Sequence, residues 1–279
     1  MKDWRGVLIT GGAGFLGRAL VEKLFAEGCE RICIYSRNEF NQYRMRVEFA
    51  DDQRLRWFIG DVRDRERLER AMGSVDAVIH AAALKRIEVG ESNPDEMVKT
   101  NVLGTINVIE AARRTDVSRV LLVSSDKAYQ PVSPYGQSKA LAESLVLNAQ
   151  DPQHGPRFAV VRYGNVAGST GSVIPTWRAL NGSVVPVTDP DCTRFWMSRE
   201  EAAALVVSTL KTMQGGELVV PELPAFKLGD LAVAMQKMYR VTGLRPCEKK
   251  HEHMAAGNGS EDARRLSVEE LRERLKILQ

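Results

Sequence analysis

Short apolar runs alternate with amphipathic stretches along the first 165 residues of this chain. The runs at 7–10, 31–35, 57–62, 75–83, 120–123 and 158–162 each predict a buried strand. Stretches with apolar residues at helical spacing lie between them, the longest at 95–114 and 134–149. Apolar strands that alternate with helices are typical of a parallel sheet covered on both faces. The pattern therefore predicts an α/β protein with a doubly wound parallel sheet.

The pattern becomes irregular after residue 165, where proline and glycine grow frequent. Such a composition suits loops and short elements, which commonly carry binding residues. We expect a nucleotide-binding domain at 1–165 and a smaller C-terminal substrate-binding lobe at 166–279, interleaved with the first. The chain closes on a capping box, Ser267 to Glu270, which predicts the start of a last amphipathic helix.

A glycine-rich loop directly follows the first predicted strand. Its glycines are spaced by three, and an amphipathic helix begins within the loop and runs to Gly28. Glycine lets the backbone turn tightly and approach a pyrophosphate, which the N–H groups at the helix N-terminus stabilise. A strand before the loop and a helix after it support a dinucleotide site, and with it a Rossmann fold. The expected cofactor contacts in this loop are Gly11, Ala13, Gly14, Phe15, Leu16 and Gly17.

The ends of the next three strands complete the expected cofactor site. Ser36-Arg37-Asn38 follows the second strand, where an acidic residue would bind the ribose 2′-hydroxyl of NAD and an arginine accommodates the 2′-phosphate of NADP. We therefore expect NADP as the cofactor. His80, at the end of the fourth strand, is interpreted as a packed core histidine. Further cofactor contacts are expected from Asp61, Val62, Ala81, Ala82 and Ala83.

The richest chemistry follows the fifth predicted strand. Ser124-Ser125-Asp126-Lys127-Ala128 lies at its carboxyl end, the edge at which open α/β sheets bind ligands. Tyr135 and Lys139 are four residues apart on the next helix and share a face. A cation beside a tyrosine hydroxyl favours the phenolate, so we expect a lowered pKa for Tyr135 and a role in removing a carbinol proton. The acid and the amine at 126 and 127 indicate more chemistry than the oxidation of an alcohol.

Composition narrows the class of function. The chain has 279 residues and a net charge of +3 from 39 basic and 36 acidic residues, which are interspersed, so a nucleic-acid partner has little support. No apolar run approaches the ~20 residues that span a bilayer. The four cysteines lack metal-ligand spacing, and His251 and His253 do not have the spacing of a helical zinc site. We therefore expect a cytoplasmic enzyme with reduced thiols, no metal and no membrane segment.

Several motifs together resemble one family, and the similarity runs nearly from end to end. The motifs are the glycine loop, Ala83-Leu84-Lys85, Lys99-Thr100-Asn101, Asp126-Lys127-Ala128 with Tyr135 and Lys139, Arg162-Tyr163-Gly164-Asn165, Arg194-Phe195-Trp196 and Arg245-Pro246-Cys247-Glu248-Lys249. The chain resembles the extended short-chain dehydrogenase/reductases and, among them, the soluble UDP-N-acetylglucosamine 4,6-dehydratases. The glycine loop and the Tyr–Lys pair indicate only the superfamily, whereas the other motifs are more specific.

The resemblance implies a role for each matching residue. Lys127 would remove the C5 proton of the sugar, Asp126 would protonate the departing C6 hydroxyl, and Tyr135 with Lys139 would serve the oxidation at C4. The implied substrate contacts are Lys85, Lys99, Thr100 and Asn165 around the sugar and nicotinamide, with Val173, Thr188, Arg194, Arg245 and Glu248, of which the last three hold the UDP. Lys85, Tyr135 and Lys139 are also expected to contact the cofactor. The resemblance further implies a homo-oligomer, at least a dimer, packed through the long helices.

Three departures from the family pattern bear on the substrate. Cys247, Arg86 and His253 stand where the family usually has glycine, histidine and an acidic residue, which leaves the exact sugar and nucleotide open. A nucleotide-sugar epimerase or an NADP-dependent reductase of the same superfamily is an alternative, and a non-catalytic NADP-binding sensor is a more remote one. Asp126-Lys127 weighs against the epimerase, and the intact Tyr–Lys pair weighs against the sensor. Tyr135, where the retaining branch often has methionine, favours inversion at C5.

Overall fold

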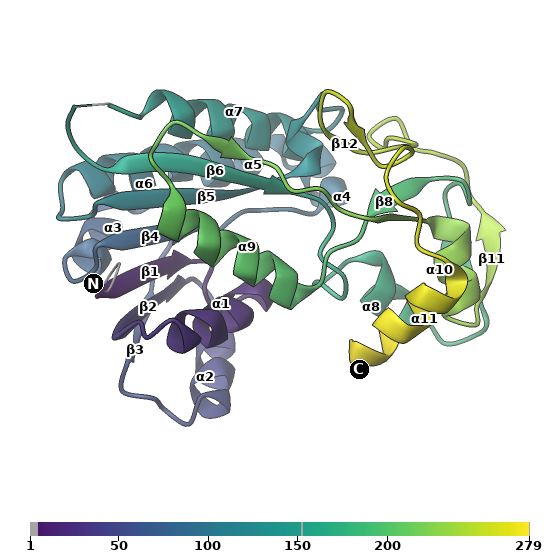
Figure 1. The fold of residues 1–279 in the computed structure, drawn as a ribbon, viewed down its shortest axis with the longest axis horizontal. Helices are drawn as coiled ribbons and strands as arrows, with labels where there is room; N and C mark the ends of the chain where they lie inside the picture. The colour runs from purple at the N-terminus through teal and green to yellow at the C-terminus, as the bar shows by residue number, and fades with distance from the viewer. Residues whose placement is uncertain (1–4, 152, 279) are drawn as a thin grey trace.

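The computed structural model describes residues 5–151 and 153–278. Seven parallel strands form the central sheet in the order β3-β2-β1-β4-β5-β6-β9 (Figure 1). The strands are β1 (Gly6–Thr10), β2 (Arg31–Ser36), β3 (Leu55–Ile59), β4 (Ala77–His80), β5 (Arg119–Ser125), β6 (Arg157–Tyr163) and β9 (Leu218–Val219). The predicted doubly wound sheet is confirmed, and six of its strands are those expected from the apolar runs.

Two predicted strands are shorter in the structure than their apolar runs. β3 ends at Ile59 and β4 at His80, whereas the predictions extended to residues 62 and 83. Residues 60–62 and 81–83 leave the sheet and form loops at its carboxyl edge. These loops expose main chain and small side chains where a ligand can approach them.

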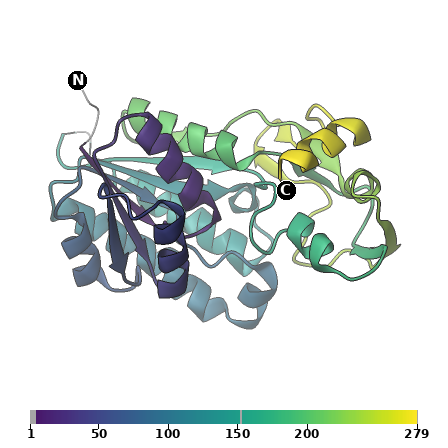
Figure 2. The same cartoon turned by 90° about the horizontal axis from the view of Figure 1, so that it is seen from below.

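Helices cover both faces of the sheet (Figure 2). On one face, α1 (Phe15–Ala26), α2 (Glu39–Glu48) and α9 (Arg199–Thr212) share a buried apolar cluster with the strands. On the other face, α3 (Arg65–Met72), α6 (Gly104–Arg113) and α7 (Pro134–Asn148) form a second cluster. Within the described residues, no helix is both long enough and apolar enough to cross a bilayer.

The helix predicted at 95–114 contains a π-helical segment. It is divided into α5 (Pro94–Met97), the π-helix η1 (Val98–Leu103) and α6, and α4 (Ile87–Ser92) precedes it. A π turn holds more residues than an α turn, so side chains before and after it no longer follow one 3.6-residue pattern. Val98, which that pattern places on the buried side, is therefore 48% exposed, while Val102 is buried.

The smaller lobe is built from short elements around its own core, which includes Trp177, Trp196 and Leu271. Its capping box at Ser267 and Glu270 is present as predicted. The elements are α8 (Val173–Ala179), β7 (Val184–Val187), β8 (Thr193–Phe195), β10 (Ala225–Lys227), α10 (Leu228–Ala234), β11 (Met238–Val241), β12 (His253–Ala255), β13 (Asn258–Gly259) and α11 (Val268–Ile277). Because α9 and β9 return to the sheet, residues beyond 165 contribute to both parts of the molecule.

Candidate active site

A cavity of about 900 Å³ lies between the carboxyl edge of the sheet and the smaller lobe. The loops that follow β1 to β6 all line it, as expected for an open α/β sheet. It brings together Asp126, Lys127, Tyr135 and Lys139, and every expected cofactor contact except Gly17. The expected contacts to the cofactor in this lining are Gly11, Ala13, Gly14, Phe15, Leu16, Ser36, Arg37, Asn38, Asp61, Val62, Ala81, Ala82, Ala83 and Lys85.

The glycine loop has the shape that a pyrophosphate needs. Gly11 has a φ of +70°, which side chains rarely allow, and its N–H donates to the Tyr35 carbonyl at 2.8 Å. Gly14 is the N-cap of α1 and supplies no side-chain cap, so the first N–H groups of the helix are free to bind an anion. A Cβ at Gly17 would overlap the Gly12 carbonyl, so Gly17 lets the helix pack closely beneath the loop. The residues present therefore fit a dinucleotide cofactor.

Arginines gather where the ribose and adenine are expected. Arg37 lines the cavity, and its Nη1 lies 3.7 Å from Oδ2 of Asp61. Arg63 binds the same carboxylate at 2.7 Å. The charges of Arg63 and Arg37 lower the pKa of Asp61, although burial opposes them. No acidic side chain ends β2, where an NAD-binding site would have one.

The loop after β4 is held by Asn101, which has no predicted role in the site. The Asn101 Oδ1 accepts from the Leu84 N–H at 2.8 Å, and its Nδ2 donates to the Leu84 carbonyl and the Ser138 Oγ at 2.9 Å each. This bridge fixes the loop beside α7. Lys85 follows directly, lines the cavity, and has its pKa lowered by burial and by the Arg86 charge. His80 is buried between hydroxyls of Thr10 and Thr105, which confirms its interpretation as a core residue.

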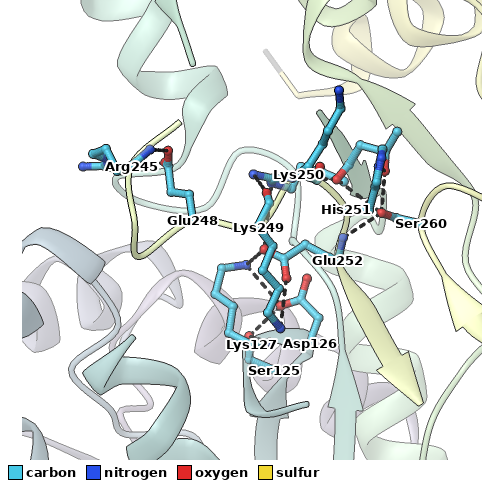
Figure 3. A network of polar contacts seen from close by, with 12 residues as sticks. Ser125, Asp126, Lys127, Arg245, Glu248, Lys249, Lys250, His251, Glu252 and Ser260 are labelled. Atoms are coloured by element: carbon cyan, nitrogen blue, oxygen red, sulfur yellow. Dashed lines mark hydrogen bonds and ion pairs between the residues drawn. The ribbon is translucent and has the colours of Figure 1, made fainter. Parts of the chain in front are cut away.

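The acid and the amine at the end of β5 form a buried cluster with a third group. Lys127 Nζ lies 3.2 Å from Oδ1 of Asp126 and 3.3 Å from Oε1 of Glu252, which comes from the smaller lobe (Figure 3). Asp126 is 1% exposed and Glu252 is 3% exposed. Burial lowers the pKa of Lys127, but the charges of Asp126 and Glu252 overcome this and raise it above its usual value. In the ligand-free protein Lys127 is therefore a cation at neutral pH, and it must lose a proton before it can accept one.

The expected lowering of the Tyr135 pKa is wrong for the ligand-free protein. Burial raises the pKa of this hydroxyl, and the Ser125 hydroxyl and the Lys127 charge offset only part of the effect. The Lys139 Nζ donates to the Val123 carbonyl at 2.7 Å, and burial lowers the pKa of Lys139 to about 8. The two side chains share a face of α7 as predicted, but the desolvation of the phenol outweighs nearby positive charge.

Like Gly17, Lys99 is a predicted site residue that lines neither this cavity nor a second, smaller cavity. Its Nζ lies 2.9 Å from both Asp95 and Glu96, and its side chain is 49% exposed. Lys99 and Thr100 are adjacent in the π-helical segment, so their side chains leave the helix in different directions. Thr100 is buried and lines the cavity, while Lys99 points to solvent.

The expected substrate contacts of the smaller lobe surround a second cavity of about 200 Å³. The two cavities share part of their walls, because four residues line both: Asn165, Val173, Arg194 and Glu248. Thr188 lines the second cavity. Arg194 donates to the carbonyls of Thr193, Lys249 and Lys250. It therefore also holds β8 to the segment that precedes β12. Arg245 lines the first cavity and binds Glu88 at 2.9 Å and Glu248 at 2.7 Å.

Buried polar atoms without a hydrogen-bond partner concentrate in these linings. Buried polar groups are nearly always satisfied in folded proteins, so such a concentration indicates a polar ligand. The atoms are Thr100 Oγ1, Ser124 Oγ, Asp126 Oδ2, Asn165 Oδ1, Ser172 Oγ and Glu252 Oε2. They extend from the end of β5 to the loop before α8, along the wall of the large cavity.

A family described as "Polysaccharide biosynthesis protein" matches residues 7–270. The chain belongs to this family. The resemblance predicted from the motifs is confirmed, and the protein is an extended short-chain dehydrogenase/reductase. The match spans the sheet, both cavities and the start of α11.

Relatives of this chain differ in the activity that their names give. The chain is 41% identical to a "UDP-N-acetylglucosamine 4,6-dehydratase (inverting)" of Campylobacter jejuni over 268 residues, 93% of this chain and 80% of the relative. It is 37% identical to a "UDP-glucose 4-epimerase" of Rickettsia conorii over 265 residues, 90% of this chain and 77% of the relative. The X-ray structure of Pen from Bacillus thuringiensis superposes with a TM-score of 0.92 at 33% identity, covering 99% of each chain.

Two ionisable residues of the site, Glu252 and Lys249, are not among the residues predicted from the sequence. Lys249 lies in a segment that carries the family resemblance, and Glu252 has no predicted role. Lys249 lines the cavity, donates to the Tyr129 carbonyl at 2.5 Å, and has its pKa lowered chiefly by burial. The local sequence carries no signal for either residue. Glu252, for example, lies 125 residues after Lys127, which it contacts.

Proposed function

We propose that this protein is a nucleotide-sugar 4,6-dehydratase that acts on UDP-N-acetylglucosamine with a tightly held NADP. The observation that carries the proposal is the buried pairing of Asp126 with Lys127 in the same cavity as Tyr135 and the glycine loop. An epimerase needs only the Tyr–Lys pair, because it removes and returns hydride at a single carbon. A buried acid beside an amine adds the means to break a C–H bond and a C–O bond on neighbouring carbons.

The residues divide the reaction among themselves. The glycine loop and Arg37 would hold NADP, which would supply the oxidation at C4 and the reduction at C6. Tyr135, in its phenolate form, accepts the C4 hydroxyl proton. The resulting ketone acidifies the C5 proton, which Lys127 removes in its neutral form. Asp126 gives its proton to the C6 hydroxyl, which leaves as water, and the transfer of a proton from Lys127 to Asp126 over 3.2 Å restores both groups. Tyr135 then gives C5 the proton that it took from the C4 hydroxyl, as C6 is reduced, and returns to its phenolate form. Positioned acid and base groups are typically worth ~10²–10⁴-fold in rate.

The second cavity supports a uridine diphosphate as the other half of the substrate. Its lining includes Trp177, Val187 and Trp196, which suit the faces of a base, and the Arg194 cation lies where both cavities meet. Arg245 and Glu248 border the same region. We assign inversion at C5, with Lys127 and Tyr135 on the two sides of that carbon, because a curated relative with the inverting activity is 41% identical.

The test uses purified protein and UDP-N-acetylglucosamine without added cofactor. Mass spectrometry should show a product lighter by one water, which supports both the dehydratase and the retained cofactor. A product of unchanged mass whose NMR spectrum shows inversion at C4 would instead make the protein an epimerase. For the stereochemistry, NMR of the fresh product in D₂O should show the L-arabino ring, and a D-xylo ring at the earliest times would mean retention at C5.

We also propose that the chain assembles at least into a dimer. Val98 and Leu103 in η1 and Leu141 in α7 are 48%, 47% and 50% exposed, and these two helical segments pack side by side. Apolar side chains grouped on neighbouring helices favour association with a second copy. Light scattering at micromolar concentration should give at least twice the 31.0 kDa of one chain, and a mass of one chain would contradict the proposal.

A further inference from the structure

Glu252 is a buried carboxylate that the proposed reaction does not use. It precedes β12 in the smaller lobe and is 3% exposed. Its N–H donates to the Ser260 Oγ at 2.9 Å, and that hydroxyl lies 2.6 Å from the Thr193 Oγ1, which in turn contacts His251 Nδ1 at 2.8 Å. Ser260 and Thr193 are fully buried or nearly so. The backbone that carries Glu252 is thus fixed from the side facing away from the cavity.

The Glu252 carboxylate reaches the cluster at the end of β5 from the opposite lobe (Figure 3). Its Oε1 lies 3.3 Å from Lys127 Nζ. Two other cations are more distant: Lys249 Nζ lies 3.9 Å from Oε2, and Arg194 Nε lies 4.0 Å from Oε1. We propose that Glu252 is a positioning residue, which holds the Lys127 amine beside Asp126 and controls when that amine can lose its proton.

Geometry makes Glu252 a better candidate for this role than for structural pairing alone. The lysine stem is flexible, and Asp126, its neighbour in sequence, contacts the amine through only one oxygen. A second carboxylate from another segment restricts the amine to the space between the two acids. A buried ion pair of this kind adds little net stability, because the desolvation of both charges opposes the attraction. Its value lies in fixing one arrangement of the proton-transfer groups.

The surrounding charges agree with this role. Asp126, Glu252 and Tyr135 favour the charged form of Lys127, whereas burial and Arg194 favour the neutral form, and Lys249 adds a further positive charge nearby. Removal of the Glu252 charge therefore shifts the balance toward a neutral amine. The same removal frees the amine to move away from Asp126, so its reactivity should rise while its use in catalysis falls.

The first experiment needs no substrate and probes Lys127 directly. Ligand-free protein is treated with a small amine-reactive reagent at fixed pH, and peptide mass spectrometry follows the labelling of Lys127. Glu252→Gln should raise the labelling rate by about tenfold. A fall of about one in the pKa of Lys127 increases the unprotonated fraction of its amine by about that factor. Glu252→Asp, which keeps the charge on a shorter stem, should lie between Gln and wild type. Glu261→Gln removes a nearby carboxylate that pairs with His253, and it should match wild type.

An unchanged labelling rate in Glu252→Gln would overturn the proposal. If that variant does not fold, the comparison of Glu252→Asp with wild type decides in the same way. Because this experiment uses no sugar nucleotide, its outcome is independent of whether the proposed dehydratase activity is correct.

The second experiment rests on the proposed function and separates positioning from structural loss. In Glu252→Gln, kcat for dehydration should fall at least about tenfold with little change in KM, as expected when an acid/base group is misplaced. Oxidation at C4 depends on Tyr135 and should persist, so reduced cofactor should accumulate and absorb at the wavelength typical of NADPH. A parallel fall of both steps, or an unchanged kcat, would contradict a positioning role. Failure of wild-type protein to release water would instead reject the proposed function.

Discussion

The two ends of the large cavity are built in opposite ways. The end that fits the cofactor consists largely of main chain and small residues from the loops that follow β1 to β4, with the glycine loop between β1 and α1 as its centre. The acid/base end consists of ionisable side chains from η2 (Asp126–Ala128), from α7 and from the segment before β12. One end is shaped by what the backbone can do, the other by charges that compensate each other.

The two ends differ in what holds their binding groups in place before a ligand binds. N–H groups at a helix N-terminus are fixed by the helix itself, and their partial charge needs no partner inside the protein. Buried carboxylates and amines are costly unless they are paired, so each one requires another, and the set must be assembled across the fold. The acid/base end should therefore be sensitive to charge, and the cofactor end to volume.

The largest expected effect is at the acid/base end. Lys127→Ala removes the group assigned to the C5 proton, and dehydration should fall by ~10²–10⁴-fold, the usual worth of acid/base catalysis. Tyr135 is untouched, so reduced cofactor should still form when UDP-N-acetylglucosamine is added, as absorbance would show. Lys237→Ala, which removes a lysine bound to the Gly182 carbonyl away from both cavities, serves as the control. Near wild-type dehydration in Lys127→Ala would mean that another residue is the base.

A single methyl group tests the cofactor end. In Gly17→Ala the new Cβ would overlap the Gly12 carbonyl, so α1 must move away from the loop. We expect a loss of ~1–3 kcal/mol in the free energy of unfolding, typical of overpacking, and cofactor lost during purification. Gly73→Ala is the matched control, because its Cβ would meet no atom closer than 3.7 Å. Equal stability and cofactor content in both variants would show that volume is not limiting here.

Arg37 is the charged side chain that we expect at the ribose, and its effect should appear in the choice of cofactor. Arg37→Asp should shift preference from NADP(H) toward NAD(H), because a charge-assisted hydrogen bond to a phosphate is worth ~1.5–3 kcal/mol. That corresponds to about ten- to a hundredfold in the ratio of dissociation constants, measured by calorimetry on cofactor-free protein. Arg44→Asp, on the exposed side of α2, should leave the ratio unchanged. Tighter binding of NAD(H) by wild-type protein would show that the interpretation of β2 is wrong.

The smallest effect is expected where the structure departs from the sequence prediction. Lys99→Ala should change dehydration by less than about twofold, since its side chain lies outside both cavities. The loss of exposed ion pairs with Asp95 and Glu96 should cost only ~0.3–0.5 kcal/mol. Steady-state kinetics and urea unfolding measure the two. A large fall in kcat would show that Lys99 contributes to the reaction, as the family resemblance implies.

The same contrast explains what could be predicted from the sequence. The glycine loop is contiguous and follows from strand, glycine and helix signals, and the other predicted cofactor contacts follow strand ends, so the residues that line this end of the cavity could be predicted from the sequence. At the acid/base end, Asp126, Lys127 and Tyr135 were found because they lie near one strand end. Glu252 was missed because only the docking of the smaller lobe places it there.

Two errors have a common physical origin in tertiary context. The outward direction of Lys99 depends on a π-helical segment, which the apolar pattern of the helix did not reveal. The raised pKa of Tyr135 depends on desolvation by residues from several elements, and spacing along one helix gives no measure of it. Local sequence patterns thus identify these side chains, but their exposure and charge state depend on contacts made across the whole fold.

The return of α9 and β9 to the sheet limits how such proteins can exchange parts during evolution. A crossover near residue 165 would join α1 of one parent to α9 of the other, across a packed core that contains Leu24 and Leu210. An exchange confined to 173–188 would alter the wall of the second cavity and leave that core intact. Diversification of the nucleotide or sugar should therefore proceed through small cassettes within the lobe, while the two halves of the sheet are inherited together.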